Sequence, residues 1–241
     1  MIARDNLTAL ILVGGLGTRL KSVIADMPKP MAPINGRPFL EYQLDFLQKS
    51  GIRKVIFAVG YKAEIIEQYF GRCWNGISIA YSHEETALGT GGAMIMAARI
   101  IPVGGAVLVM NGDTYFPVEI TKMLDHHNAG NASVSIAMFN SEEAGRYSSF
   151  SVAADMRIIR INDQESRLKS GGVYIFSPDI VDEFRMRPVQ KISFERDITP
   201  ALLEENKKML AFVKPCIFID IGVPDDYARA SEIVGKSNDQ T

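Results

Sequence analysis

The chain has 241 residues, of which 47% are hydrophobic and 22% charged, and its formal net charge is −2. These values are ordinary for a globular protein with a sizeable core, and they give no basic footprint for nucleic acid or an anionic membrane. The sequence contains no run of about 20 apolar residues and no signal-peptide pattern, so neither a transmembrane helix nor secretion is expected. Cys73 and Cys216 lack metal-type spacing, which favours two packing residues in a reduced, cytoplasmic setting.

The first half of the chain alternates predicted strands and helices. Short apolar runs predict strands at 7–13, 55–59, 77–81 and 106–110. Apolar residues at helical spacing, with Pro or Gly at the ends, predict helices at 38–50, 63–70 and 91–101. This alternation predicts a largely parallel sheet with helices on both faces.

The second half is richer in strands. The predicted strands are 133–139, 147–153, 157–161, 173–176, 209–213 and 218–221, and the predicted helices are 180–184, 199–205 and 224–233. The segments 147–153 and 157–161 read as a hairpin within a strand-rich insertion that could cap the first sheet as a lid. His126 and His127 are expected at a solvated helix end. No linker rich in Pro, Gly or Ser divides the chain, so residues 1–241 read as one domain, with a polar tail at 235–241.

The glycine-rich stretch after the first predicted strand is the strongest functional signal. Gly14-Gly15-Leu16-Gly17-Thr18-Arg19 lets backbone N–H groups approach an anion closely, and Arg19 can clamp phosphate oxygens. Lys29, held between Pro28 and Pro30, adds a point charge. The spacing fits neither a P-loop nor a dinucleotide fingerprint. At the end of the first strand of an α/β sheet, these residues predict a site for a di- or triphosphate.

Two aspartates follow predicted strands. Asp113 ends Asn111-Gly112-Asp113 after the apolar run 106–110, and Asp220 lies between apolar neighbours near the C-terminus. Two carboxylates together with phosphate oxygens make a typical Mg²⁺ site. The alternative is that each is a separate turn or capping residue.

A third glycine loop, Leu88-Gly89-Thr90-Gly91-Gly92, precedes a predicted helix. Thr90 is expected as the helix N-cap, and the glycines would let a flat base lie against the backbone.

Together these segments resemble the sugar-1-phosphate nucleotidyltransferase family over about residues 7–230. The motifs that carry the resemblance, in the family's order, are Gly14–Leu20, Pro28-Lys29-Pro30-Met31, Leu88–Ala93, Asn111-Gly112-Asp113, Gly171-Gly172-Val173-Tyr174, Ser193-Phe194-Glu195 and Asp220–Tyr227. The resemblance implies a Rossmann-like three-layer α/β/α domain with a mixed, mainly parallel sheet and a small β-rich sugar-binding lobe. It also implies a nucleotide-binding half at about 1–130 and a sugar-binding half at about 131–230.

The implied reaction joins a nucleoside triphosphate to a sugar 1-phosphate and releases pyrophosphate. The implied catalytic residues are Arg19, on the leaving phosphates, Lys29, on the α-phosphate or the sugar phosphate, and Asp113, which would hold Mg²⁺ with Asp220. The implied nucleotide contacts are Leu12, Gly14, Gly15, Gly17, Thr18, Arg19, Leu88, Gly89, Thr90 and Gly112. On the sugar side the candidates are Ser148, Lys169, Gly172, Glu195 and Lys214, where Glu195 has the alternative reading of a helix-start carboxylate.

Departures from the family pattern lie on the sugar side. Many relatives carry Tyr-Gly where this chain has Tyr147-Ser148, and Asn where Ser170 stands. Many also carry a lysine for the sugar phosphate at the end of the lid hairpin, where Ile161–Glu165 supplies none. Lys169 or Lys214 is the hypothesised replacement.

Within the family, the detail of these motifs is most similar to guanylyltransferases that act on D-glycero-α-D-manno-heptose 1-phosphate and serve surface-glycan biosynthesis. The expected substrates are therefore GTP and that heptose phosphate, with no nucleic acid or membrane partner and a possible homodimer. Mannose or glucose 1-phosphate with GTP, UTP, dTTP or CTP is the enzymatic alternative. A nucleotide-binding regulatory subunit with weak turnover is the alternative from another class.

Overall fold

The apolar runs of the first half form the centre of the sheet. The computed structural model describes residues 1–15, 17, 27–143, 145–214 and 217–234. The parallel strands of the first half are β1 (Leu7–Leu12), β4 (Lys54–Val59), β6 (Ile77–His83) and β7 (Ala106–Asn111), where β1 pairs with both β4 and β7. β1 and β7 are buried almost throughout, as expected for strands covered on both faces.

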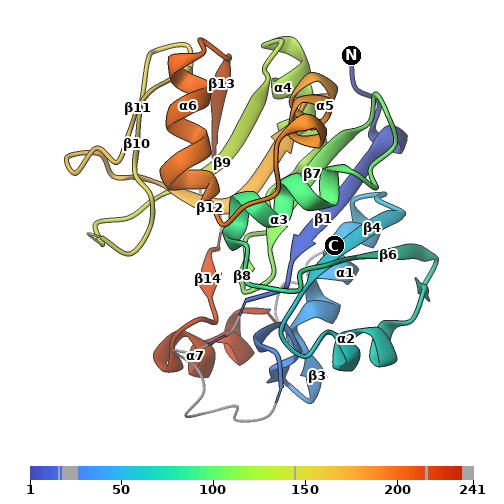
Figure 1. The fold of residues 1–241 in the computed structure, drawn as a ribbon. Coiled ribbons are helices and arrows are strands. Elements are labelled where there is room, and N and C mark those ends of the chain that lie inside the picture. Colours follow the sequence, from blue (N-terminus) through green and yellow to red (C-terminus); the bar gives the residue numbers. More distant parts are fainter. Residues whose placement is uncertain (16, 18–26, 144, 215–216, 235–241) are drawn as a thin grey trace.

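Strands from the second half extend this sheet beyond β7. Within the described residues, the order is β13-β9-β12-β7-β1-β4-β6-β5 across eight strands (Figure 1). The added strands are β9 (Val134–Asn140), β12 (Leu168–Phe176) and β13 (Met209–Val213), and the far edge is β5 (Cys73–Trp74). β12 runs antiparallel to both of its neighbours. The mixed, mainly parallel sheet of the predicted fold class is confirmed.

Most strands of the second half belong to the main sheet and not to a separate insertion. β10 (Phe150–Val152) and β11 (Ile158–Ile161) form a separate antiparallel hairpin. The segments β9, β12 and β13 join the main sheet because they are buried over most of their length. The predicted hairpin is confirmed, and it is joined to β12 by the turn that follows Ile161.

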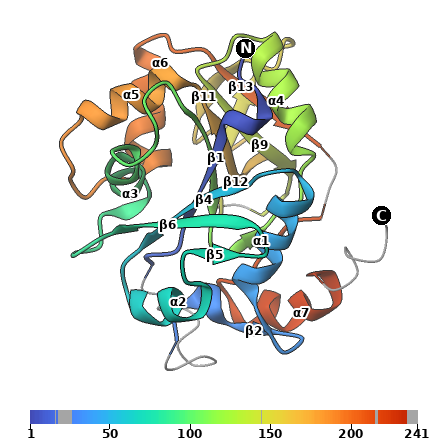
Figure 2. The same cartoon turned by 90° about the vertical axis from the view of Figure 1, so that its right-hand side faces the viewer.

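Helices cover both faces of the sheet, as Figure 2 shows. One face carries α1 (Phe39–Lys49), α2 (Ala63–Phe70) and α4 (Ile120–Ala129), and the other carries α3 (Gly89–Ala98), α5 (Pro178–Met186) and α6 (Thr199–Glu204). In α1, Leu40, Leu44 and Leu47 recur at helical spacing and are fully buried. The last helix, α7 (Pro224–Val234), packs through Ala230 and Val234 in a separate cluster with Phe39 of α1.

Short strand pairs lie beside the sheet. β2 (Pro33–Ile34) pairs with β3 (Arg37–Pro38), and β8 (Thr114–Tyr115) pairs with β14 (Ile219–Asp220). The second pair connects the end of β7 to the C-terminal part of the chain, and it decides where both candidate metal ligands lie.

Several local expectations are corrected. β12 begins at Leu168 rather than 173 and runs through the glycine pair with an irregular register. His127 is buried in α4 with 2% exposure, because the helix packs its last turn against β9, where Ser135 lies 2.9 Å from the ring nitrogen. Cys73 is exposed on the edge strand rather than packed. Cys216 and the predicted tail at 235–241 lie outside the described residues.

In the parts of the chain that the structure describes, no helix combines the length and apolar character needed to cross a membrane.

Candidate active site

The glycine loop leaves β1 and meets the turn after β7. The N–H of Gly112 donates to the carbonyl of Leu12 at 3.0 Å. A β-carbon at Gly112 would lie 2.6 Å from that carbonyl oxygen, so the close approach of the two loops requires glycine. Gly17 has φ +58°, in the left-handed region that favours glycine. Leu16, Thr18 and Arg19 lie outside the described residues.

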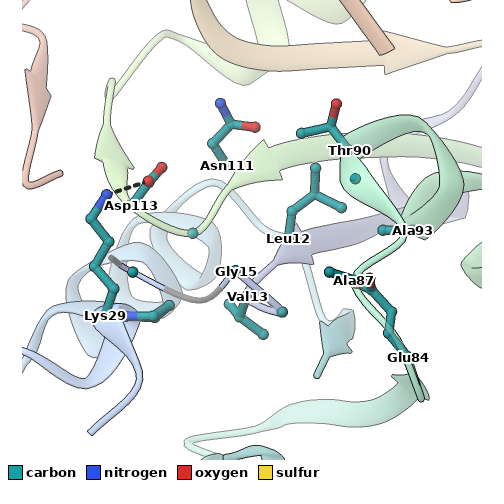
Figure 3. A pocket seen from close by; sticks show the side chains of 15 residues that line it. Leu12, Val13, Gly15, Lys29, Glu84, Ala87, Thr90, Ala93, Asn111 and Asp113 are labelled. Atoms are coloured by element: carbon teal, nitrogen blue, oxygen red, sulfur yellow. Dashed lines mark hydrogen bonds and ion pairs between the residues drawn. The ribbon is translucent and has the colours of Figure 1, made fainter. Parts of the chain in front are cut away.

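A first cavity of about 370 Å³ opens above this loop (Figure 3). Lys29 and Asp113 stand at one end, and Glu84 and Thr90 stand at the other. Of the predicted nucleotide contacts, the cavity brings together Leu12, Gly14, Gly15, Gly17, Gly89, Thr90 and Gly112. Leu88 is not among its lining residues, but its N–H donates to Oε2 of the lining residue Glu84 at 3.0 Å. This is a concave, glycine-rich site at the carboxyl ends of parallel strands, where such sheets bind ligands.

Lys29 links the two candidate metal ligands. Its Nζ lies 2.6 Å from Asp113 Oδ2 and 3.9 Å from Asp220 Oδ1. The side chains of Lys29 and Asp220 are each only 8% exposed. The backbone explains the convergence, because Asp220 pairs with Thr114 across β14 and β8 and the Ile221 N–H donates to the Asp113 carbonyl at 2.9 Å.

Two carboxylates and two cations meet in this cluster, because Arg146 Nη2 also lies 3.4 Å from Asp220 Oδ2. Burial raises the pKa of Asp220, and the nearby Asp113 carboxylate raises it further, against the opposing effect of Lys29 and the Gly222 N–H. No group of three or more His, Cys, Asp or Glu side chains gathers as a complete ligand set within the described ranges. Two carboxylates that need phosphate oxygens to complete the coordination fit the way Mg²⁺ is bound with nucleotides.

A second cavity of about 250 Å³ adjoins the first and shares Asn111 and Asp113 with it. Ser148, Gly172 and Glu195, all predicted for the sugar side, line it. Its lining residues also include Tyr174, Arg146 and Asp220. Sugar hydroxyls could bond to carboxylate, hydroxyl and backbone groups of this kind.

Glu195 is held in place by its neighbours. It accepts from Tyr174 Oη at 2.6 Å and from Thr90 Oγ1 at 3.2 Å. Burial and the Glu195 charge raise the pKa of Tyr174, so its phenol stays a donor. Thr90 is not the helix N-cap that was predicted: that position is Leu88, and Thr90 Oγ1 instead accepts from the Phe194 N–H at 2.9 Å. Thr90 thus connects the two cavities.

The structure separates the two lysines from the second cavity. Lys169 is 5% exposed, and its Nζ donates to the Ser166 carbonyl at 2.9 Å. Lys214 lines a neighbouring third cavity of about 410 Å³ and lies 5.9 Å from the ring of Phe212. Neither is among the residues that line the second cavity.

Three polar residues of the site were missed at the level of sequence. Glu84 lines the first cavity, and burial raises the pKa of its carboxyl although the Leu88 N–H acts in the opposite direction. Asn111 lines both cavities, and its buried Oδ1 has no hydrogen-bond partner in the described part of the chain. Arg146 lines the second and third cavities. The sequence indicated these residues only by their position beside the motifs. Glu84 precedes the Leu88 loop, Asn111 opens Asn111-Gly112-Asp113, and Arg146 precedes Tyr147-Ser148.

Comparison with known proteins agrees with this geometry. The chain is 42% identical over 227 residues to a D-glycero-α-D-manno-heptose 1-phosphate guanylyltransferase of Aneurinibacillus thermoaerophilus, which covers 93% of this chain and 96% of that protein. It is 40% identical to the protein of the same name from Campylobacter jejuni, covering 91% and 96% respectively. The crystal structure of HddC from Yersinia pseudotuberculosis complexed with GMP-PN superposes with a TM-score of 0.78 at 34% identity, covering 93% of this chain and 98% of that one.

A structure at low identity bears on the fold alone. A Bacillus anthracis protein described as a putative glucose-1-phosphate thymidylyltransferase superposes with a TM-score of 0.83 at 17% identity, over 95% of each chain.

The family model described as nucleotidyl transferase matches residues 8–237, which is nearly the whole chain. The chain therefore belongs to the nucleotidyl transferase family.

Proposed function

We propose that this protein transfers the GMP group of GTP to D-glycero-α-D-manno-heptose 1-phosphate and releases pyrophosphate. The observation that carries the proposal is the pair of adjoining cavities that meet at Asp113, with Lys29 and Asp220 at the junction. The names of relatives at 40% and 42% identity supply the choice of substrates. Such an enzyme works on triphosphates made inside the cell, which favours a cytoplasmic setting.

The reaction is an in-line displacement at the α-phosphorus. A phosphate oxygen of the sugar 1-phosphate forms the new bond to the α-phosphorus, and the bond from that phosphorus to the oxygen bridging to the β-phosphate breaks. The nucleophile is already ionised near neutral pH, so no general base is needed. Positioning and charge stabilisation are then the main contributions of the protein.

Each side chain of the junction has a role in that scheme. Lys29, almost fully buried, offers its ammonium to the phosphate that undergoes attack. Asp113 and Asp220 would hold Mg²⁺, which when bound screens phosphate charge. The motif assigns Arg19 to the leaving β- and γ-phosphates, although it lies outside the described residues.

Guanine is favoured by the chemistry of Glu84 at the far end of the first cavity. The Watson–Crick edge of guanine presents N1–H and N2–H donors, and a carboxylate accepts from such a pair. The Leu88 N–H at 3.0 Å takes only part of the acceptor capacity of this carboxylate. Adenine has an acceptor in place of N1–H, so it could not donate such a pair of hydrogen bonds to the half-buried carboxylate.

The test is pyrophosphate release with Mg²⁺, comparing GTP, ATP, CTP, UTP and dTTP, each with the heptose phosphate and with mannose 1-phosphate. Release with GTP and the heptose phosphate, at a kcat/KM well above every other pair, is expected. A faster reaction with another pair would change the substrates but keep the mechanism. Triphosphate binding without release from any pair would contradict catalysis and favour a regulatory subunit.

A further inference from the structure

The lining of the second cavity carries more acidic than basic side chains among the described residues. Its lining includes three acids, Asp113, Glu195 and Asp220, and among the described lining residues a single base, Arg146. A sugar 1-phosphate that enters this cavity carries its phosphate toward the acidic side. A phosphate is held against such a field only where a cation lies within reach of its oxygens.

Lys29 is a second cation at the junction of the two cavities, and it is already engaged. Its ammonium lies between Asp113 and Asp220, and it faces the first cavity. Lys169 and Lys214 do not line the second cavity, since the first donates to a carbonyl and the second lies at the third cavity.

Arg146 stands at the boundary of the second and third cavities, with its side chain 23% exposed. Its guanidinium carbon lies 5.0 Å from the centre of the Tyr147 ring, within the range of a cation–π contact. An Nη2 atom contacts Asp226 and lies 3.4 Å from Asp220, and Nη1 lies 3.4 Å from Glu143. The two 3.4 Å contacts are long for charge-assisted hydrogen bonds, so only the contact with Asp226 is close.

Part of the guanidinium has no partner. The Nε of Arg146 is buried and makes no hydrogen bond within the described part of the chain. A donor buried in this way costs stability. Because solvent does not reach Nε, a phosphate oxygen can accept from it only after the guanidinium turns toward the cavity. The planar fork of arginine can meet phosphate oxygens with two N–H groups at once.

We propose that Arg146 binds the phosphate of the sugar 1-phosphate in the second cavity. This inference rests on the proposed function. Asp226 and Tyr147 are positioning residues, because they hold the guanidinium while its remaining N–H groups turn to the substrate. The cation needed on the sugar side then comes from the residue just before Tyr147-Ser148, on the lid side of the cavity, and not from a lysine.

The experiment compares Arg146→Gln and Arg146→Lys with the wild-type chain. For Arg146→Gln, the KM for the sugar 1-phosphate should rise about 10- to 100-fold, as for the loss of a charge-assisted hydrogen bond, while the KM for GTP stays within about twofold. Arg146→Lys should recover part of the loss. The matched control is Arg229→Gln, because Arg229 also contacts Asp226, at 3.4 Å, but does not line the second cavity.

A binding measurement separates this inference from the proposed function. Calorimetry in the presence of a non-hydrolysable GTP analogue would compare heptose 1-phosphate and mannose 1-phosphate with the same sugars lacking phosphate. Arg146→Gln should abolish most of the preference for the phosphorylated sugar, whichever sugar the enzyme turns over. If that preference is unchanged, or if phosphorylated and free sugars weaken equally, Arg146 has only a structural role and the inference is wrong.

Discussion

Lys29 and Asp113 are joined by an ion pair of 2.6 Å although they lie 84 positions apart in the chain. The first follows the glycine loop and the second follows β7, so the pair connects the two strand ends that carry the first cavity. The ammonium is therefore already in place beside the acid before substrates arrive. Such preorganised charge is the property that lowers a barrier to phosphoryl transfer.

Replacement of Asp113 by Asn should lower kcat by about 10²- to 10³-fold, because a charged group of the proposed reaction centre is lost. Stability should fall by about 1–3 kcal/mol, since Lys29 loses its close charged partner in a buried place. Pyrophosphate-release kinetics and urea unfolding measure the two effects. The control is Glu119→Gln, which removes an exposed partner of Lys122 and should change neither. An Asp113→Asn enzyme with normal kcat would remove Asp113 from the mechanism.

Glu84→Gln should weaken base selection. The neutral amide keeps the shape of the side chain but offers one acceptor in place of a carboxylate, so the ratio of kcat/KM for GTP over ATP should fall about 10- to 100-fold. Because burial raises the pKa of Glu84, wild-type preference for GTP should also decline on acidification sooner than for an ordinary glutamate. Initial rates with both triphosphates across pH check this. Glu85→Gln, at an exposed neighbour, should leave the ratio unchanged.

The contrast between Glu84 and Glu85 shows which part of the site the sequence could not predict. The fold class could be predicted because the central strands β1, β4 and β7 are short apolar runs and helices such as α1 carry apolar residues at helical spacing. The phosphate loop could be predicted because its glycines and its place after β1 have few other physical uses. Two adjacent glutamates, in contrast, have the same local chemistry. Only the path of the chain after β6 directs Glu84 toward the first cavity and leaves Glu85 exposed.

The residues on the sugar side were harder to predict from the sequence, because contacts between distant segments decide their positions. Lys169 was a reasonable candidate by charge, but its place on β12 directs the ammonium to the Ser166 carbonyl. Arg146 became a candidate only when the pairing of β8 with β14 brought Asp220 to the same cavity. His127 was expected in solvent because nothing in the polar end of α4 indicates which side of its last turn meets β9. Long-range contacts decide all three positions.

Gly172→Ala should damage the sugar side. Gly172 has φ +72°, and a β-carbon there would lie 2.5 Å from Asn111 Nδ2, in the wall of both cavities. Alanine should cost about 1–2 kcal/mol from the backbone conformation alone and should also displace Asn111, which raises the KM for the sugar 1-phosphate.

The control for this substitution separates strain from contact. Gly104 has φ +71°, but no atom lies within 4 Å of its would-be β-carbon. Gly104→Ala should therefore show the conformational cost in thermal unfolding and leave both KM values unchanged. Equal kinetic effects from the two substitutions would mean that the contact with Asn111 does not matter.

His127 should make stability depend on pH. Burial lowers the pKa of His127 to about 4, the positive field of His126 contributes in the same direction, and Asp179 partly opposes both. The unfolded chain therefore binds the proton first as pH falls. The stability due to the neutral ring is complete above pH 6.5 and is lost progressively between pH 6.5 and about 4. From pH 7 to pH 5 the loss from this one group is about 2 kcal/mol.

Urea unfolding at pH 7 and pH 5 measures that loss, and the His127→Gln variant isolates it. The variant should be less stable at pH 7, because its side chain must fit a buried space shaped for imidazole. Its stability should nevertheless decline less between the two pH values than that of the wild-type chain. His83→Gln, which changes a side chain that is 58% exposed, should keep the wild-type pH dependence. If His127→Gln also keeps it, the buried ring does not set the acid stability of the fold.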